Sequence, residues 1–261
     1  GTANNSGTVN IKNTEDNFSF DISEMRDVWY KTSFLLDQKQ TANGLAKNRF
    51  DNYKNQPLAY KFPDNFTGKL EDFVTSSAVE KPKAAIIREK GSNSEREMAN
   101  AMYLAGFDVK DVHMTDLISG RETLEDIQFI GAVGGFSNSD VLGSAKGWAG
   151  AFKYNEKANT ALKNFFERKD TLSVGICNGA QLWMELDLIN PDHKVHGKLV
   201  HNDSKKHESS FTSVKIQENN SVMLSSLAGT ELGVWISHGE GKFNLPEKEE
   251  NYNIVAKYGY E

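Results

Sequence analysis

Cysteine and long apolar runs are the features that the sequence has least of. The 261 residues contain one cysteine, so the chain cannot form a disulfide within itself or a metal site built from several thiolates. A single thiol fits a reducing compartment, and we expect a cytoplasmic protein. No run approaches the roughly 18 apolar residues that span a bilayer, and "GTANNSGTVN" lacks the basic and apolar parts of a signal peptide. We therefore expect no membrane partner.

An excess of positive charge is also missing. The formal net charge is −6, and acidic and basic residues are interspersed. Proteins held by nucleic-acid phosphates usually present a basic face, so we expect no nucleic-acid partner. Among the histidines only His193 and His196 approach a metal-ligand spacing, and without a third ligand we expect no metal site. A hydrophobic content of 38% with 10% aromatic residues indicates a globular chain.

Short apolar runs alternate with helix-like stretches in the middle of the chain. We expect strands at residues 84–87, 108–114, 127–133 and 172–176, and helices at about 94–106, after a cap at Ser92 or Asn93, and at 156–170. This order predicts an α/β fold, an open and mostly parallel sheet flanked by helices on both faces. After Pro191 the chain becomes rich in strand-like segments.

The first 82 residues differ from the rest and contain too few apolar positions to fold alone. We expect a mobile segment at 1–17, a short strand at 18–22, a helix at 24–39 capped by Asp21 or Ser23, and a loose connector with short helical pieces at 41–75. The sequence thus predicts a helical connector over residues 1–82 and one larger domain over residues 83–261.

The single cysteine lies in "LSVGICNGAQLW", where Gly175 and Gly179 stand two residues on either side of Cys177. An apolar strand precedes it and a helix follows, which is the setting of a nucleophile elbow. The glycines remove Cβ atoms that would clash in so sharp a turn. The helix N-terminus favours a thiolate, and the N–H of Asn178 points where an oxyanion would form. A lone cysteine is more often a small buried residue, but this context favours a nucleophile.

A second loop, "GGFSNSDVLGSAKGWA", begins with two adjacent glycines directly after the third predicted strand. It should therefore lie at the same sheet edge as Cys177. Adjacent glycines can turn their N–H groups toward a ligand oxygen, which is the second half of an oxyanion hole. A generic glycine-rich turn is the alternative. The pattern is not G-x-G-x-x-G, so we do not expect a dinucleotide site.

These two motifs, in this order, resemble the class I glutamine amidotransferase domain of the large, single-chain phosphoribosylformylglycinamidine synthases. The segments "IIREKGSNSEREMANAMYLAGFDV", "VHMTDLISGR" and "VWISHGEGKF" resemble the same family, and "ISEMRDVWYKTSF" resembles the end of its synthase portion and the connector that follows. The resemblance thus implies that residues 1–82 are the connector and the edge of the synthase portion. The resemblance covers residues 18–261 and implies a flavodoxin-like fold. It implies that L-glutamine is hydrolysed through a cysteine thioester and that ammonia passes to a synthase portion of the same polypeptide. That portion would use ATP and magnesium to convert formylglycinamide ribonucleotide to the amidine, and no cofactor is implied for this domain.

Carried over by position, the resemblance makes Cys177 the nucleophile and the N–H groups of Gly135 and Asn178 the oxyanion hole. It places three further residues in or near the glutamine pocket: Gln181, His238 and Glu240.

His238 and Glu240, two residues apart after an apolar strand, would share one strand face and suggest a base with its orienting acid. The resemblance instead places that catalytic pair in a later segment, beyond Glu261, so that the chain would be a C-terminal fragment truncated before its end. We expect the remaining histidines to be surface or loop residues.

Two positions depart from the family pattern. Ala180 stands where a second cysteine is usual, and Ser210 stands where arginine is usual. The first change should pack equally well, and the second could weaken an anion or interdomain contact.

Two other interpretations stay open: a different cysteine hydrolase on a related α/β scaffold, and a non-catalytic fragment that docks on the synthase portion. The loop at 134–149 argues against the first. Glutaminase activity of the purified chain would exclude the second.

Overall fold

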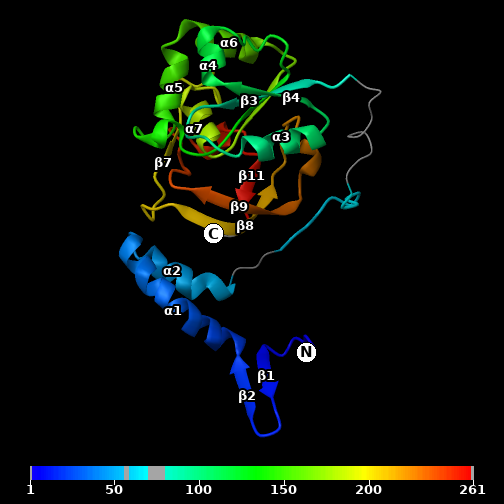
Figure 1. Cartoon of the computed structure of the whole chain (residues 1–261), viewed down its shortest axis with the longest axis vertical. Helices are drawn as coiled ribbons and strands as arrows, with labels where there is room; N and C mark the ends of the chain where they lie inside the picture. The colour runs from blue at the N-terminus through cyan, green and yellow to red at the C-terminus, as the bar shows by residue number, and fades with distance from the viewer. Residues whose placement is uncertain (1, 56–58, 70–79, 260–261) are drawn as a thin grey trace.

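A computed structural model of the chain describes residues 2–55, 59–69 and 80–259. Its centre is a four-stranded, all-parallel sheet in the order β4-β3-β5-β6 (Figure 1). These strands are β3 (Lys83–Arg88), β4 (Asp108–His113), β5 (Phe129–Ala132) and β6 (Leu172–Gly175). The sequence prediction of a parallel α/β sheet is confirmed.

Helices cover both faces of this sheet. One face carries α4 (Met114–Ser119), α5 (Lys146–Lys153), α6 (Glu156–Glu167) and α7 (Asn178–Glu185). Their apolar side chains form the larger core, around the fully buried Trp148, Phe152 and Phe165. The opposite face is covered by α3 (Glu95–Leu104), whose Met98 and Met102 belong to a smaller core. Apolar burial on both faces explains why the central strands β3 and β5 are nearly continuous apolar runs.

Antiparallel strands follow the α/β part, as the strand-like segments after Pro191 predict. The strands β8 (Glu208–Ile216), β9 (Glu231–His238) and β11 (Ala256–Tyr258) form a sheet in the order β11-β8-β9. A second pair joins β7 (Lys198–Val200) to β10 (Lys242–Asn244). Single 3-10 turns lie at Ser225–Leu227 (η4) and Glu249–Asn251 (η5). The two antiparallel sheets place β7 and the end of β9 beside the edge of the parallel sheet at which β6 ends (Figure 1).

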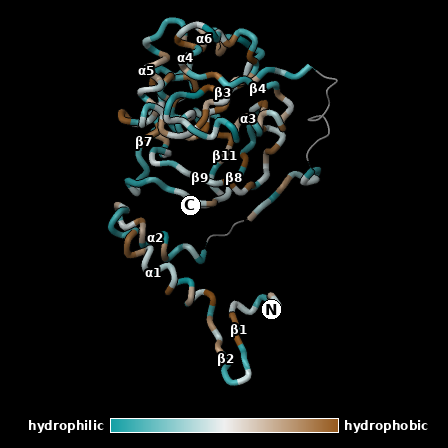
Figure 2. Tube along the Cα trace, viewed as in Figure 1, coloured by the Kyte–Doolittle hydropathy of each residue, from teal (hydrophilic) through white to brown (hydrophobic). Residues whose placement is uncertain are grey.

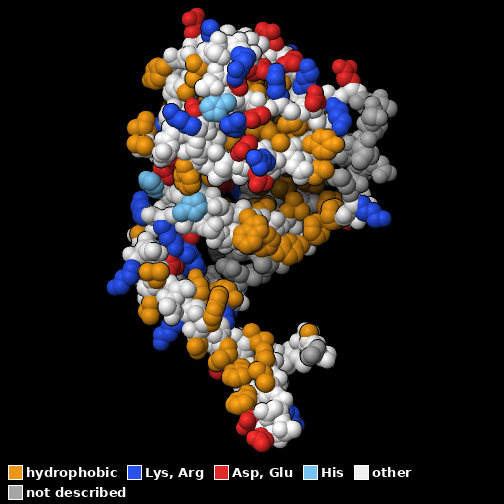
Figure 3. All heavy atoms as spheres, viewed as in Figure 1, with side chains coloured by type: hydrophobic (Ala, Val, Ile, Leu, Met, Phe, Trp, Pro, Cys, Tyr) orange, Lys and Arg blue, Asp and Glu red, His pale blue; other side chains and the backbone are white. Residues whose placement is uncertain are grey.

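The N-terminal part extends away from this body (Figure 1). It consists of a hairpin of β1 (Thr8–Lys12) and β2 (Asn17–Asp21), the helices α1 (Ile22–Gln40) and α2 (Leu45–Asn52), and the 3-10 turn η1 (Tyr53–Asn55). Asp21 caps α1 by accepting a hydrogen bond from the Glu24 N–H at 2.9 Å, one of the two caps that the sequence predicts. Many apolar side chains of the hairpin and α1 are exposed (Figure 3), and Figure 2 shows hydrophobic positions along the same elements.

Several local expectations were wrong. Residues 8–12 form a strand because they pair with β2, a contact that their polar composition does not reveal. The cap of α3 is Ser94 rather than Ser92 or Asn93, since the Ser92 hydroxyl instead donates to the Glu89 carbonyl at 2.6 Å. The helices α4 and α5 were missed. Parts of the predicted connector, residues 56–58 and 70–75, lie outside the described residues.

Candidate functional site

Cys177 lies at the turn from β6 into α7, with φ at 52° and ψ at −109°. An L-residue rarely adopts this left-handed region, so the surrounding structure holds the turn under strain. The turn lifts the thiol above the first residues of α7. This is the strand–elbow–helix geometry in which nucleophiles of α/β hydrolases are exposed.

The two flanking glycines have no room for a side chain. A Cβ on Gly175 would lie 2.6 Å from the carbonyl oxygen of Gly179, and a Cβ on Gly179 would lie 2.1 Å from the carbonyl oxygen of Ala132. Both obstacles are backbone atoms, which cannot rotate away. The close approach of α7 to β5 and β6 therefore requires glycine at both positions.

Two backbone N–H groups beside Cys177 are free to bind an oxygen. Gly135 has φ at 110°, and its neighbours are tied by Asn93 N–H to Gly134 O and by Phe136 N–H to Gly91 O, both at 2.9 Å. In the described part of the chain, neither the Gly135 N–H nor the Asn178 N–H donates to any acceptor. Fixed, unpaired donors of this kind are what an oxyanion hole needs.

A buried chain of hydrogen bonds joins the three loops around the cysteine. The Ser137 N–H donates to Asn178 Oδ1 at 3.1 Å, Asn178 Nδ2 donates to Gln181 Oε1 at 2.7 Å, and Gln181 Nε2 donates to the Glu240 carbonyl at 2.9 Å. Asn178 and Gln181 are 1% and 5% exposed, so these bonds are shielded from water. The amide of Gln181 is thus engaged in supporting the site.

Glu240 connects two further loops through its carboxylate. It accepts hydrogen bonds from the Ser144 N–H at 2.6 Å and the Ser144 hydroxyl at 3.1 Å. His201 Nε2 lies 3.4 Å from its Oε1. Because β9 ends at His238, Glu240 lies in the turn beyond the strand, so the period-two argument that paired it with His238 does not apply.

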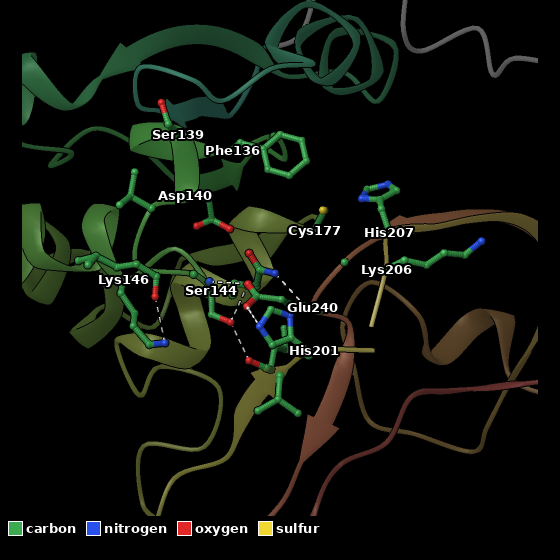
Figure 4. Close-up of a pocket in the computed structure, with 18 of the residues that line it drawn as sticks. Phe136, Ser139, Asp140, Ser144, Lys146, Cys177, His201, Lys206, His207 and Glu240 are labelled. Carbon is green, nitrogen blue, oxygen red and sulfur yellow. Dashed lines mark hydrogen bonds and ion pairs between the residues drawn. The ribbon is translucent and has the colours of Figure 1, made fainter. Parts of the chain in front are cut away.

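These residues surround a cavity of about 630 Å³, open to solvent on one side. Of the six site residues that the sequence predicts, Cys177, Gly135, Gln181 and Glu240 line it, while Asn178 and His238 do not. Cys177 faces the cavity from the turn after β6, and His201, Lys206 and His207 come from the loop between β7 and β8 (Figure 4). Charged side chains of both signs also line the cavity, namely Asp140, Glu240, Lys146, Lys205 and Lys206.

His201 and His207 are the pocket residues that sequence reasoning missed, since both were expected to be surface or loop residues. Both are exposed, but toward the cavity. His207 Nε2 lies 2.9 Å from the Ser237 hydroxyl, and the Cys177 thiol lies 3.5 Å from the Ser237 carbonyl. Pairing of β8 with β9 creates this arrangement, and no local sequence signal reports it.

His238 occupies a different position, behind the cavity wall. Its Nδ1 lies 2.9 Å from Asn202 Oδ1. Burial lowers the pKa of His238 below its ordinary value, and the nearby His207 lowers it further, while Glu208 acts in the opposite direction. The ring is therefore neutral at pH 7 and serves a hydrogen bond within the wall.

Metal chemistry finds no support in the described part of the chain. No group of three or more His, Cys, Asp or Glu side chains in residues 2–55, 59–69 and 80–259 could hold a metal ion. Within the same residues, no helix is both long and apolar enough to cross a bilayer.

Comparison with known proteins identifies the family. Residues 81–260 match the family described as CobB/CobQ-like glutamine amidotransferase domain. A protein of Arabidopsis thaliana named "Probable phosphoribosylformylglycinamidine synthase, chloroplastic/mitochondrial" is 41% identical over 240 residues, which are 87% of this chain and 16% of that protein. The Homo sapiens "Phosphoribosylformylglycinamidine synthase" is 38% identical over 251 residues, 90% of this chain and 19% of the relative. The chain thus spans less than a fifth of the length of these relatives.

A solved structure supports the fold. The "Structure of PurLQS from Thermotoga maritima" contains a chain that matches with a TM-score of 0.56 at 24% identity, covering 70% of this chain and 76% of that chain. The resemblance predicted from the elbow and the double-glycine loop is confirmed at the level of the domain. The chain belongs to the family of CobB/CobQ-like glutamine amidotransferase domains.

Proposed function

We propose that this chain is the glutaminase part of a phosphoribosylformylglycinamidine synthase. The observation that carries the proposal is the position of Cys177, in a strained elbow between two unpaired N–H donors and at the edge of a cavity of about 630 Å³. We propose this particular synthase because the relatives bear its name.

In the proposed reaction the Cys177 sulfur attacks the side-chain amide carbon of glutamine. The tetrahedral oxyanion accepts hydrogen bonds from the N–H groups of Gly135 and Asn178. Its collapse breaks the C–N bond, the thiol proton leaves with the nitrogen as ammonia, and a glutamyl thioester remains. Water then cleaves the thioester, which gives glutamate and restores the thiol.

The base that moves these protons is proposed to lie outside the described residues. His207 Nε2 already lies within hydrogen-bond distance of the Ser237 hydroxyl, and His201 Nε2 faces Glu240. The resemblance implies a catalytic pair in a later segment than His238 and Glu240, and we propose that pair as the base and its orienting acid. His238 and Glu240 serve, in this proposal, to support the glutamine pocket rather than to carry protons.

The partners are proposed from the same family relationship. L-glutamine is the substrate, and a synthase portion, supplied with ATP and magnesium, consumes the ammonia to make the amidine from formylglycinamide ribonucleotide. We propose that residues 1–82 are a connector and that residues 83–261 are the glutaminase domain. The family match, which begins at residue 81, supports this division. The outward apolar side chains of α1, with Trp29 79% exposed, offer a surface for the synthase portion. A cytoplasmic location remains a prediction from the single cysteine.

The proposal is tested by intact mass after incubation with 6-diazo-5-oxo-norleucine, a glutamine mimic that alkylates amidotransferase cysteines. We expect one adduct on the wild-type chain, suppressed by excess glutamine, and none on Cys177→Ala. Iodoacetamide serves as the control for a merely accessible thiol. Alkylation by iodoacetamide without any adduct from the glutamine mimic would contradict a formed glutamine pocket in this chain.

A further inference from the structure

One wall of the cavity is the loop of residues 201–207, which contributes His201, Lys205, Lys206 and His207. Its inner side contacts the catalytic region through the Ser237 hydroxyl, which lies 2.9 Å from His207 Nε2. Its outer side contacts the N-terminal helices α1 and α2. The wall is thus shared between the glutaminase body and the connector.

The turn between α1 and α2 donates hydrogen bonds to the main chain of this loop. The Ala42 N–H donates to the Ser204 carbonyl at 2.9 Å, and Asn43 Nδ2 donates to the Asp203 carbonyl at 3.0 Å. These bonds join positions about 160 residues apart in the chain. They fix the backbone of the loop relative to α1.

A buried carboxylate on α1 also binds this loop through an ion pair. Asp37 is 7% exposed and pairs with the ammonium group of Lys206. It also accepts a hydrogen bond from the Thr41 hydroxyl at 2.6 Å and pairs with Arg49 Nη1 at 3.1 Å. Burial alone would raise the pKa of Asp37, but the hydrogen bonds from Lys206 and Thr41 and the charges of Arg49 and Lys206 hold it below its ordinary value. The carboxylate is therefore charged at neutral pH and joins two cations.

Removal of this one charge would take away the ion-pair partner of Lys206 in the described residues, whereas Arg49 would keep its ion pair with Glu208. Lys206 has 22% of its side chain exposed and lines the cavity, so it would move toward solvent. Truncating one partner of a buried ion pair is costly because the remaining charge is uncompensated. Movement of Lys206 would displace the adjoining His207, and with it the cavity wall.

We propose that Asp37, on the connector helix α1, is a positioning residue for the glutamine pocket, which acts by holding Lys206 and the loop 201–207 in place. The inference rests on the proposed glutaminase function. It makes α1 a part of the pocket's support, so that a partner bound to α1 can bias glutamine binding through a single ion pair.

The test is the rate of Cys177 alkylation by 6-diazo-5-oxo-norleucine at increasing reagent concentration, which separates KI from kinact. We expect Asp37→Asn and Lys206→Gln each to raise KI about tenfold, with kinact changed less than about twofold. The double variant should be no worse than Lys206→Gln, because the two residues act through one contact. Asp27→Asn is the matched control, since Asp27 lies on the same helix and pairs with Lys54 and Arg26 far from the loop.

A milder variant guards against loss of folding. Asn43 has φ at 60° and is replaced without strain by glycine, so Asn43→Gly removes only its bond to the loop and should raise KI about threefold. Equal KI values for the wild type, Asp37→Asn and Asn43→Gly would overturn the inference, as would additive effects in the double variant.

Hydrogen exchange separates this inference from the proposed function. We expect faster exchange at residues 201–207 in Asp37→Asn but not in Asp27→Asn, whether or not the chain binds glutamine. A wild type that is not alkylated would refute the glutaminase proposal and, with it, the assigned role of Asp37. A normally alkylated wild type with unchanged exchange in Asp37→Asn would refute the role of Asp37 alone.

Discussion

Gly179 fixes how closely α7 approaches the parallel sheet. A Cβ at this position would lie 2.1 Å from the Ala132 carbonyl oxygen. We expect Gly179→Ala to lower the free energy of unfolding by about 2–3 kcal/mol, because backbone must shift to accept the methyl group. Urea unfolding followed by circular dichroism measures the change.

Gly150→Ala is the matched control, since its new Cβ would contact Tyr154 at an ordinary 3.8 Å. Alanine favours a helix over glycine by about 1 kcal/mol, so this variant should be neutral or slightly more stable. Equal stability of the two variants would show that the elbow is not crowded.

The half-buried ring of His238 makes stability depend on pH. Burial and then His207 lower its pKa below 6.5, so the folded protein binds the proton less tightly than the unfolded chain. This contribution to stability is complete above about pH 6.5 and is lost as the pH falls through the lower folded value. We expect His238→Gln to flatten the decline in Tm between about pH 7 and pH 5.

Thermal unfolding of the wild type and His238→Gln at several pH values measures the change. A decline of the same size in His238→Gln and the wild type would show that His238 does not cause it.

The chemistry of the site could be predicted at residue scale where it is local. Cys177, Gly135 and Asn178 are identified by glycine spacing and by their positions after strands. Asp37, His201 and His207 could not be identified in this way. Their positions depend on tertiary contacts, 169 positions apart for Asp37 with Lys206 and 30 positions apart for His207 with Ser237, for which one sequence contains no signal.

At the scale of elements, we expect the β1–β2 hairpin to be the least stable part of the fold. Among the described residues, its two five-residue strands pair with each other and with no further strand, and a lone hairpin is marginally stable in water. We expect its amides to exchange within seconds, while those of β3 and β5, buried between helices, stay protected far longer. Hydrogen exchange read by mass spectrometry tests this. Protection of the hairpin equal to that of β8 and β9 would contradict it.

Length decided which elements the sequence predicted. The central strands β3 and β5 are short apolar runs, and α6 has a full amphipathic pattern over 12 residues. The helices α4 and α5 have six and eight residues, too few for a periodic pattern to stand out. Tertiary packing determines them, through buried residues such as Leu117 and Trp148.

At the scale of the whole molecule, α1 presents an apolar stripe to solvent. Ile22, Met25, Trp29 and Leu36 recur at helical spacing and are 52%, 41%, 79% and 59% exposed (Figure 3). Contiguous exposed apolar surface promotes association. We expect the chain to self-associate with rising concentration in sedimentation velocity, and Trp29→Glu to reduce this without changing Cys177 alkylation.

Tyr154→Glu is the matched control for this prediction. Tyr154 is 91% exposed at the end of α5, away from the stripe. It should leave self-association unchanged. Equal effects of the two substitutions would show that added negative charge, rather than loss of the stripe, separates the molecules.

The overall architecture could be predicted because alternating strands and helices restrict an α/β chain to few topologies. The strand order β4-β3-β5-β6 and the attachment of α1 to the loop at 201–207 could not. Sheet order and docking depend on which surfaces fit together, and hydrophobic pattern alone does not encode that choice.

The solitary thiol at the edge of an open cavity has a consequence for oxidative stress. Peroxide converts an accessible thiolate to a sulfenic acid, which a neighbouring cysteine usually captures as a disulfide before further damage. These 261 residues contain no second cysteine, so oxidised Cys177 has no internal resolving partner. Among these residues, protection from the irreversible sulfinic state cannot come from a second cysteine, whereas a bound substrate shields the sulfur simply by occupying the same space.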